Sequence, residues 1–182
     1  MESMKKIYLY ICILSLFCAC SSNELSLSDQ LGYKASIDTV DILQQEYPLI
    51  FSCMFGMQGD KQGKIKINKL GIQFPEEVSQ ERARSLLLHF IETYLDVINS
   101  TEELKPHLSN YPFTKENIEF VVYFSAPDGS MSYHPNINVC AFRNGKLIYK
   151  TEEEGQTKGY KSIIRESYEE AMEKEKNSLM KN

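Results

Sequence analysis

The stretch INVCAFRNGKLIYK, residues 137–150, carries the strongest local folding signal of the chain. Two short runs rich in apolar residues, 137–142 and 146–150, flank the dipeptide Asn144-Gly145. Asn and Gly both tolerate a positive φ, which a two-residue turn between antiparallel strands requires. The stretch therefore predicts a β-hairpin, whose strands need further strands or helices to cover them.

Strand patterns also occur on the N-terminal side of this hairpin. Residues 117–124 alternate, which is typical of a half-buried strand. Residues 49–55 are largely apolar, and residues 64–74 alternate in two phases, which indicates a bulge near Asn68 and Lys69. A glycine-rich turn separates these two segments, so they predict a second antiparallel hairpin.

Four segments predict helices. The clearest, 79–99, begins at Ser79, a good N-cap residue, and carries one apolar stripe. Residues 30–47 have loosely helical spacing, and residues 101–108 predict a shorter helix. A last helix should begin at Ser167, because Glu follows it at capping-box spacing.

This order of segments predicts the fold class. It is α+β, with a largely antiparallel sheet of about five strands and helices packed on one face. Residues 160–166 fit either a strand or an early helical turn and are not counted among the five.

The N-terminus predicts an export signal. Lys5 and Lys6 precede a nearly unbroken apolar stretch, 7–19, which is too short to span a bilayer. The stretch ends in FCAC, residues 17–20, which resembles a bacterial lipobox because a small residue stands directly before Cys20. An ordinary secretory signal without lipid is the alternative.

The lipobox resemblance implies that residues 1–19 are cleaved and that Cys20 becomes the diacylated first residue. Cys18 is a poorer candidate, since the residue before it is the bulky Phe17. Acyl chains hold a protein on a membrane because each buried methylene contributes about 0.8 kcal/mol. Ser21 rather than Asp follows Cys20, which by similarity to Gram-negative lipoproteins implies sorting to the outer membrane of the cell envelope.

The remaining chain predicts a short tether, residues 20–29, and a single domain, residues 30–182. The whole chain has 20 basic and 25 acidic residues and no basic stripe in its sequence. This charge argues against a nucleic-acid partner, which would require basic residues to contact phosphates. We expect the acidic domain to be held off anionic lipid head groups.

Two thiols remain once Cys20 carries lipid. Cys53 and Cys140 both fall in predicted strands, and an oxidising compartment would allow them to form a disulfide. The alternative is two small buried side chains that lie too far apart. His89, His107 and His134 show no metal-ligand spacing, so the sequence predicts no metal and no other cofactor.

Three short segments carry a second resemblance. Residues 110–114 (NYPFT), 144–146 (NGK) and 168–171 (YEEA) are similar to an uncharacterised family of small envelope lipoproteins from intracellular bacteria. These motifs are a helix stop, a hairpin turn and a helix cap. The resemblance therefore implies no activity and no site residues.

The sequence thus predicts a lipid-anchored envelope protein with a non-catalytic interaction or structural role. Its expected partners are the membrane, through the lipid, and an unidentified envelope protein. The alternative is a small ligand-binding module or hydrolase that uses Tyr133 and His134 in the polar loop 126–136. A nucleophilic site there would also need an orienting carboxylate and an oxyanion hole, which the sequence does not identify.

Overall fold

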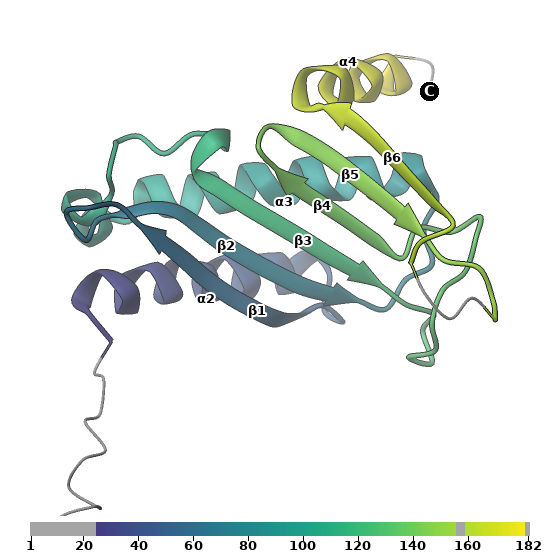
Figure 1. Cartoon of the computed structure of the whole chain (residues 1–182), viewed down its shortest axis with the longest axis horizontal. Coiled ribbons are helices and arrows are strands. Elements are labelled where there is room, and N and C mark those ends of the chain that lie inside the picture. Colours follow the sequence, from purple (N-terminus) through teal and green to yellow (C-terminus); the bar gives the residue numbers. More distant parts are fainter. Residues whose placement is uncertain (1–24, 156–158, 181–182) are drawn as a thin grey trace, which may run out of the picture.

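One six-stranded sheet organises the protein, whose computed structural model describes residues 25–155 and 159–180 (Figure 1). The strands follow one another across the sheet in chain order: β1 (Phe51–Gly59), β2 (Ile65–Phe74), β3 (Ile118–Phe124), β4 (Val139–Arg143), β5 (Lys146–Thr151) and β6 (Ser162–Ser167). Neighbours run antiparallel except β2 and β3, which are parallel. The predicted α+β class and the largely antiparallel sheet are confirmed. The segment left open between strand and helical turn forms β6, so the sheet has six strands rather than about five.

The hairpin of β4 and β5 forms at the predicted dipeptide. Asn144 has a φ of 51° and Gly145 a φ of 70°, and Arg143 pairs with Lys146 across the turn. Because a one-residue slip would move every side chain to the other side of the sheet, this turn fixes which residues of both strands face the core.

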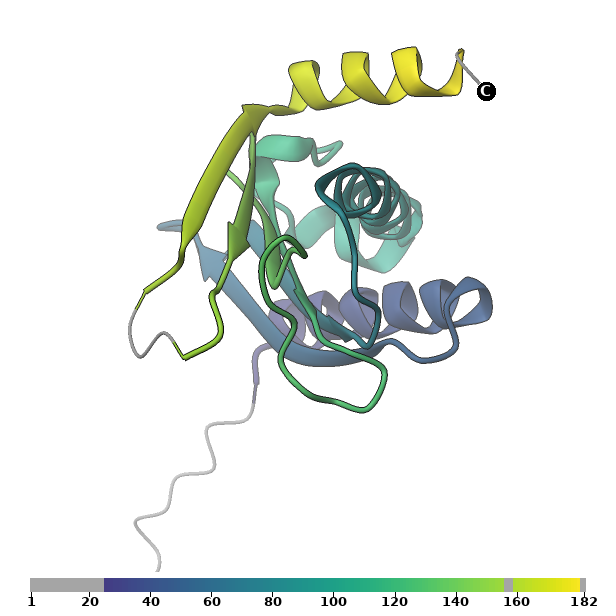
Figure 2. The same ribbon diagram turned by 90° about the vertical axis from the view of Figure 1, so that its right-hand side faces the viewer.

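Three α-helices lie on one face of the sheet (Figure 2). They are α2 (Leu27–Glu46), α3 (Gln80–Ser100) and α4 (Tyr168–Leu179). Two 3₁₀ helices, η1 (Glu102–His107) and η2 (Lys115–Asn117), lie between α3 and β3. No described helix covers the opposite face, here called the open face, which is formed by outward side chains of the strands such as Val121 and Ala141.

The predicted caps of α3 and α4 are confirmed. Ser79 Oγ accepts a hydrogen bond from the N–H of Arg82 at 3.3 Å. Ser167 forms a capping box with Glu170, as its spacing predicts. These caps satisfy backbone N–H groups that have no partner inside the helix.

The core lies between the sheet and the helices α2 and α3. Every member of the predicted apolar stripe of α3 is fully buried: Ala83, Leu87, Ile91, Tyr94 and Ile98. Next to that stripe, the ring of Phe90 packs against Tyr47, Phe74 and Phe120, with centroid distances of 5.5, 6.5 and 6.1 Å. This aromatic cluster joins α3 to β2 and β3.

The N-terminal helix begins earlier than predicted. Residues 20–29 were expected to form a tether, but α2 starts at Leu27. Ser26 caps it, because its Oγ accepts a hydrogen bond from the N–H of Asp29 at 3.1 Å. The described part of the tether is therefore shorter than the polar composition suggests.

The bulge predicted near Asn68 and Lys69 lies two residues earlier in β2. Both residues pair regularly with β1, and the register shifts lie between Ser52 and Met54 and between Gln58 and Gly59. Asn68 belongs to the buried side of β2, where its side-chain N–H donates to Gly32 O in α2 at 3.2 Å. The shift between Gln58 and Gly59 leaves Lys66 of β2 without a partner in β1, so the strand does change phase there and Ile65 is buried.

Candidate functional site

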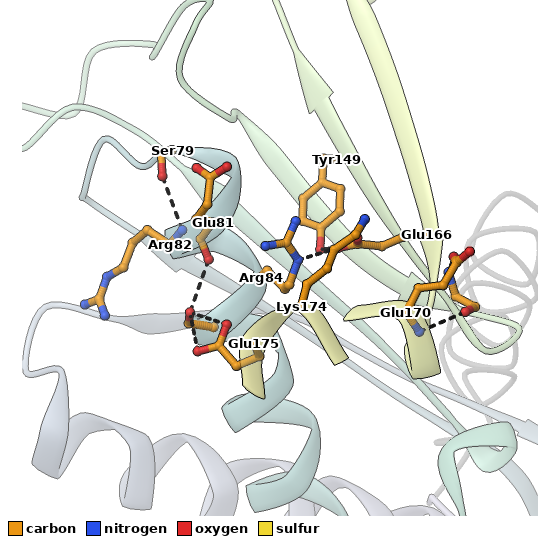
Figure 3. Close-up of polar contacts among 11 residues, drawn as sticks. Ser79, Glu81, Arg82, Arg84, Tyr149, Glu166, Glu170, Lys174 and Glu175 are labelled. Carbon is orange, nitrogen blue, oxygen red and sulfur yellow. Dashed lines mark hydrogen bonds and ion pairs between the residues drawn. The ribbon is translucent and has the colours of Figure 1, made fainter. Parts of the chain in front are cut away.

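The most buried group of charges surrounds Glu166 of β6 (Figure 3). Arg84 Nε of α3 donates to Glu166 Oε1 at 2.7 Å, and Lys174 Nζ of α4 donates to Oε2 at 2.6 Å. The hydroxyl of Tyr149 in β5 also donates to Oε1. The Glu166 side chain is only 3% exposed, so protein donors replace the water it would otherwise bind.

Protonation states in this cluster favour a structural role. Burial alone would raise the pKa of Glu166, but the hydrogen bonds from Arg84, Lys174 and Tyr149 outweigh burial and lower that pKa. Burial, with Cys140 and Glu166 adding to it, raises the pKa of the Tyr149 phenol, which stays protonated and donates. Both oxygens of Glu166 are engaged, so this carboxylate holds α4 and β6 against α3 and is poorly placed to exchange protons with a substrate.

The structure does not bring the two described thiols together. Cys53 in β1 is exposed, Cys140 in β4 is buried, and both are free. β2 and β3 lie between their strands, which puts the two backbones about 14 Å apart at ~4.8 Å per strand. A disulfide needs Cα atoms within about 7 Å. Partial desolvation raises the pKa of the Cys53 thiol and full burial raises that of Cys140, so neither is an activated nucleophile.

The three histidines lie on different elements. His89 of α3 has its Nε2 3.0 Å from Glu46 Oε2, His107 ends η1, and His134 lies in the loop before β4. Among the residues that the structure describes, no three His, Cys, Asp or Glu side chains are grouped to hold a metal ion.

The loop that the sequence singles out is mostly occupied by structural contacts. The N–H of His134 donates to Glu152 O at 2.7 Å, while Tyr133 and His134 themselves are exposed. Glu153, the acidic residue that follows Glu152, pairs with Lys161 at 2.7 Å. Within residues 25–155 and 159–180, no carboxylate hydrogen-bonds to the His134 imidazole, as a nucleophilic site would require.

A pocket of about 350 Å³ lies beside this loop, at the end of β3. Ser125, directly after β3, is among its lining residues and is 6% exposed. Its Oγ is the one buried side-chain polar atom without a hydrogen-bond partner in residues 25–155 and 159–180. Such groups are rare because leaving one unpaired costs about 1–3 kcal/mol.

The other walls of this pocket, called the Ser125 pocket, supply mixed chemistry. Two phenols, a carboxylate, an amide and a hydroxyl contribute, from Tyr123, Tyr160, Glu152, Gln73 and Ser130. Burial raises the pKa of Tyr123, which therefore stays a hydrogen-bond donor. Neither Tyr133 nor His134 belongs to this lining, whereas Gly129, Ser130 and Met131 of the same loop do.

A second hollow, of about 210 Å³, lies on the open face. Met54, Val121 and Ala141 form its apolar floor. Glu119 stands at its edge and pairs with Lys69 at 3.1 Å and with Arg143 at 2.9 Å. Alternation along single strands could have identified these outward residues, but their convergence depends on the order of the strands.

Comparison of the chain with protein-family models, with curated proteins and with solved structures finds no match. Among the described helices, none combines the length and the apolar character needed to cross a membrane.

Proposed function

We propose that this chain is a lipid-anchored protein of the bacterial envelope, sorted to the outer membrane, and that its domain binds a component of that envelope without catalysing a reaction. The open face of the sheet carries the proposal. It exposes an apolar hollow beside the ion pairs of Glu119 and leaves large side chains such as Phe51 and Met54 in solvent. An exposed apolar patch with a charged rim is typical of a binding surface.

The polar groups of the domain also favour binding over catalysis. Glu166 is fully engaged by its donors, Cys140 is buried as a neutral thiol, and no carboxylate of the described residues hydrogen-bonds to the His134 ring. General acid–base or nucleophilic chemistry needs such groups to be accessible and activated.

The lipid anchor predicts a loss of membrane attachment on replacing Cys20 by Ala. The Cys20→Ala variant, expressed as the full chain in a bacterium, should be lost from the membrane pellet after alkaline washing. The wild-type protein should stay in the pellet, because its acyl chains hold it in the membrane. Intact-mass analysis of the wild-type protein should give a chain that begins at Cys20 and carries diacylglycerol.

Cys18→Ala is the matched control, since Cys18 lies two residues away and is not the predicted lipid acceptor. It should leave both the pellet and the intact mass of the mature chain unchanged. A wild-type mass beginning at Met1, or equal retention of all three proteins, would contradict the anchor.

The Ser125 pocket supports a second candidate function, a small-ligand module. The observation that supports this function is the unpaired Ser125 hydroxyl. An unpaired buried hydroxyl destabilises the free protein, and the simplest reason to retain it is that a ligand forms a hydrogen bond with it. Hydroxyl, amide, carboxylate and aromatic walls suit a neutral ligand with several hydroxyl groups.

Ser125→Ala should therefore stabilise the free chain by about 1 kcal/mol while weakening ligand binding by roughly threefold to tenfold. Urea denaturation measures the first effect, and saturation-transfer NMR with glucose as the probe measures the second. Ser130→Ala, in the same pocket but exposed, serves as the control for stability. A Ser125→Ala chain that is less stable and binds glucose as the wild type does would exclude this function.

A further inference from the structure

The open face is basic, although the chain as a whole is acidic. The formal net charge is −5 at pH 7. The strand registers nevertheless place five basic side chains at outward positions: Lys69, Arg143, Lys146, Lys150 and Arg165. Glu119 is the single acidic residue at an outward strand position in the described sheet.

The acidic residue on this face is already neutralised. Glu119 pairs with both Lys69 and Arg143, at 3.1 and 2.9 Å. Lys146 and Arg165, which belong to the neighbouring strands β5 and β6, make no ion pair within the described residues, and Lys150 lies over the ring of Tyr160. Glu152, in the loop after β5, lines the Ser125 pocket at one end of this face and adds one negative charge there, but the five basic side chains still leave the open face net positive.

The helices on the covered side of the sheet carry a net negative charge. The helix α2 contains four acidic residues and one Lys, and α4 contains four acidic residues and two Lys. Both helices lie on the covered side of the sheet (Figure 2). Folding thus separates the charges of one acidic chain into a basic face and an acidic face.

Apolar side chains are exposed on the same basic face. Phe51, Met54 and Ile163 occupy outward positions of the two edge strands, and each is between 43% and 48% exposed. Basic side chains mixed with exposed aromatic and aliphatic ones are typical of surfaces that contact lipid head groups.

The proposed anchor keeps this face near such a surface. Leu27, the first residue of α2, is seven peptide bonds from Cys20, so the connection spans at most about 25 Å. The backbone of α2 lies directly on the first hairpin of the sheet, since Gly32 lies against Met57 and Ile65. A lipid on Cys20 would hold the sheet within one domain diameter of the head groups.

We propose that the domain lies with the open face of its sheet, rather than its helices, against an anionic phospholipid surface. This rests on the proposed lipid anchor at Cys20. It replaces the expectation from net charge, under which the whole domain is held off anionic lipid, because the membrane interacts with the charges of the face that approaches it and not with their sum.

Lysine footprinting of the full lipidated protein tests this orientation. The protein is reconstituted into vesicles of phosphatidylcholine alone, or of equal parts phosphatidylcholine and phosphatidylglycerol, and acetylated briefly before mass spectrometry. Lys146 and Lys150 should react about fivefold more slowly on the anionic vesicles, and 0.5 M salt should remove the difference. Lys34 and Lys176, on α2 and α4, should react equally on both.

A charge-reversal pair provides the matched control. Lys146→Glu with Arg165→Glu should abolish the protection of Lys150, whereas Lys34→Glu with Lys176→Glu should leave it unchanged. Protection of Lys34 and Lys176 instead, or equal reaction of all four lysines on both vesicles, overturns the proposal. Protection of Lys146 and Lys150 only in native membranes, and not in protein-free vesicles, also overturns it and assigns the face to a protein partner.

Flotation of the same vesicles separates this proposal from the anchor on which it depends. A chain that does not float with pure phosphatidylcholine lacks the lipid anchor. A chain that floats on both vesicles but shows no change at Lys146 and Lys150 has the anchor and a different orientation.

Discussion

Replacing Arg84 by Ala should lower the free energy of unfolding by about 3–5 kcal/mol. Arg84 is buried on α3 and donates to Glu166 at 2.7 Å, while Glu166 itself is 3% exposed. Removing the guanidinium leaves a buried carboxylate with fewer donors and a void beside Tyr149. Urea denaturation followed by circular dichroism measures the loss, and α4 should become sensitive to protease, because Lys174 binds the same carboxylate.

Arg82→Ala is the matched control for this prediction. Arg82 lies two residues earlier on the same helix and pairs with Glu76 at 3.3 Å, but both side chains are exposed. Exposed pairs contribute about 0–1 kcal/mol, so this variant should unfold almost as the wild type does. If both variants lost the same free energy of unfolding, burial of the Arg84–Glu166 pair would not explain its contribution to stability.

A loss of similar size, about 3–5 kcal/mol, is expected for Phe90→Ala. Phe90 is fully buried, and its ring contacts Tyr47, Phe74 and Phe120, which come from three other segments of the chain. Truncation removes apolar area and leaves a cavity that these rings cannot fill without leaving their rotamers. Thermal and urea denaturation should both report the loss, with no change in the secondary structure of the folded state.

The control is Phe51→Ala, which removes the same side chain from an edge strand where it is 48% exposed. Its expected cost is below about 1 kcal/mol, since surface substitutions away from special contacts have small effects. If Phe51→Ala lowered the free energy of unfolding as much as Phe90→Ala, the aromatic cluster around Phe90 would not be the main source of core stability.

Local rules predicted the elements that depend on local chemistry. The turn at Asn144-Gly145 needs only two residues that accept a positive φ, and α3 needs only the Ser79 cap and a stripe at helical spacing. Both formed as predicted. The start of α2 was missed because the same Ser and Asp residues that cap a helix also occur in flexible tethers.

Features that depend on distant segments could not be predicted in this way. Glu166 resembles a surface charge in its sequence context, and its partner Arg84 is 82 residues away. The basic residues of the open face are spread over four strands, so no basic stripe appears until those strands are ordered. The unpaired Ser125 hydroxyl is equally invisible, because whether a polar atom is satisfied is decided by its three-dimensional neighbours.

The strand pairs of the sheet differ in the length of chain that connects their two strands, and the parallel pair β2–β3 has a long connection. Joining these two strands encloses all of α3 and η1, whereas β1–β2 and β4–β5 meet across short turns. Closing a long segment loses more chain entropy before any contact compensates for it. We therefore expect the docking of α3, which brings the N-terminal hairpin and the C-terminal strands together, to limit the rate of folding, so that substitutions in its buried stripe slow refolding.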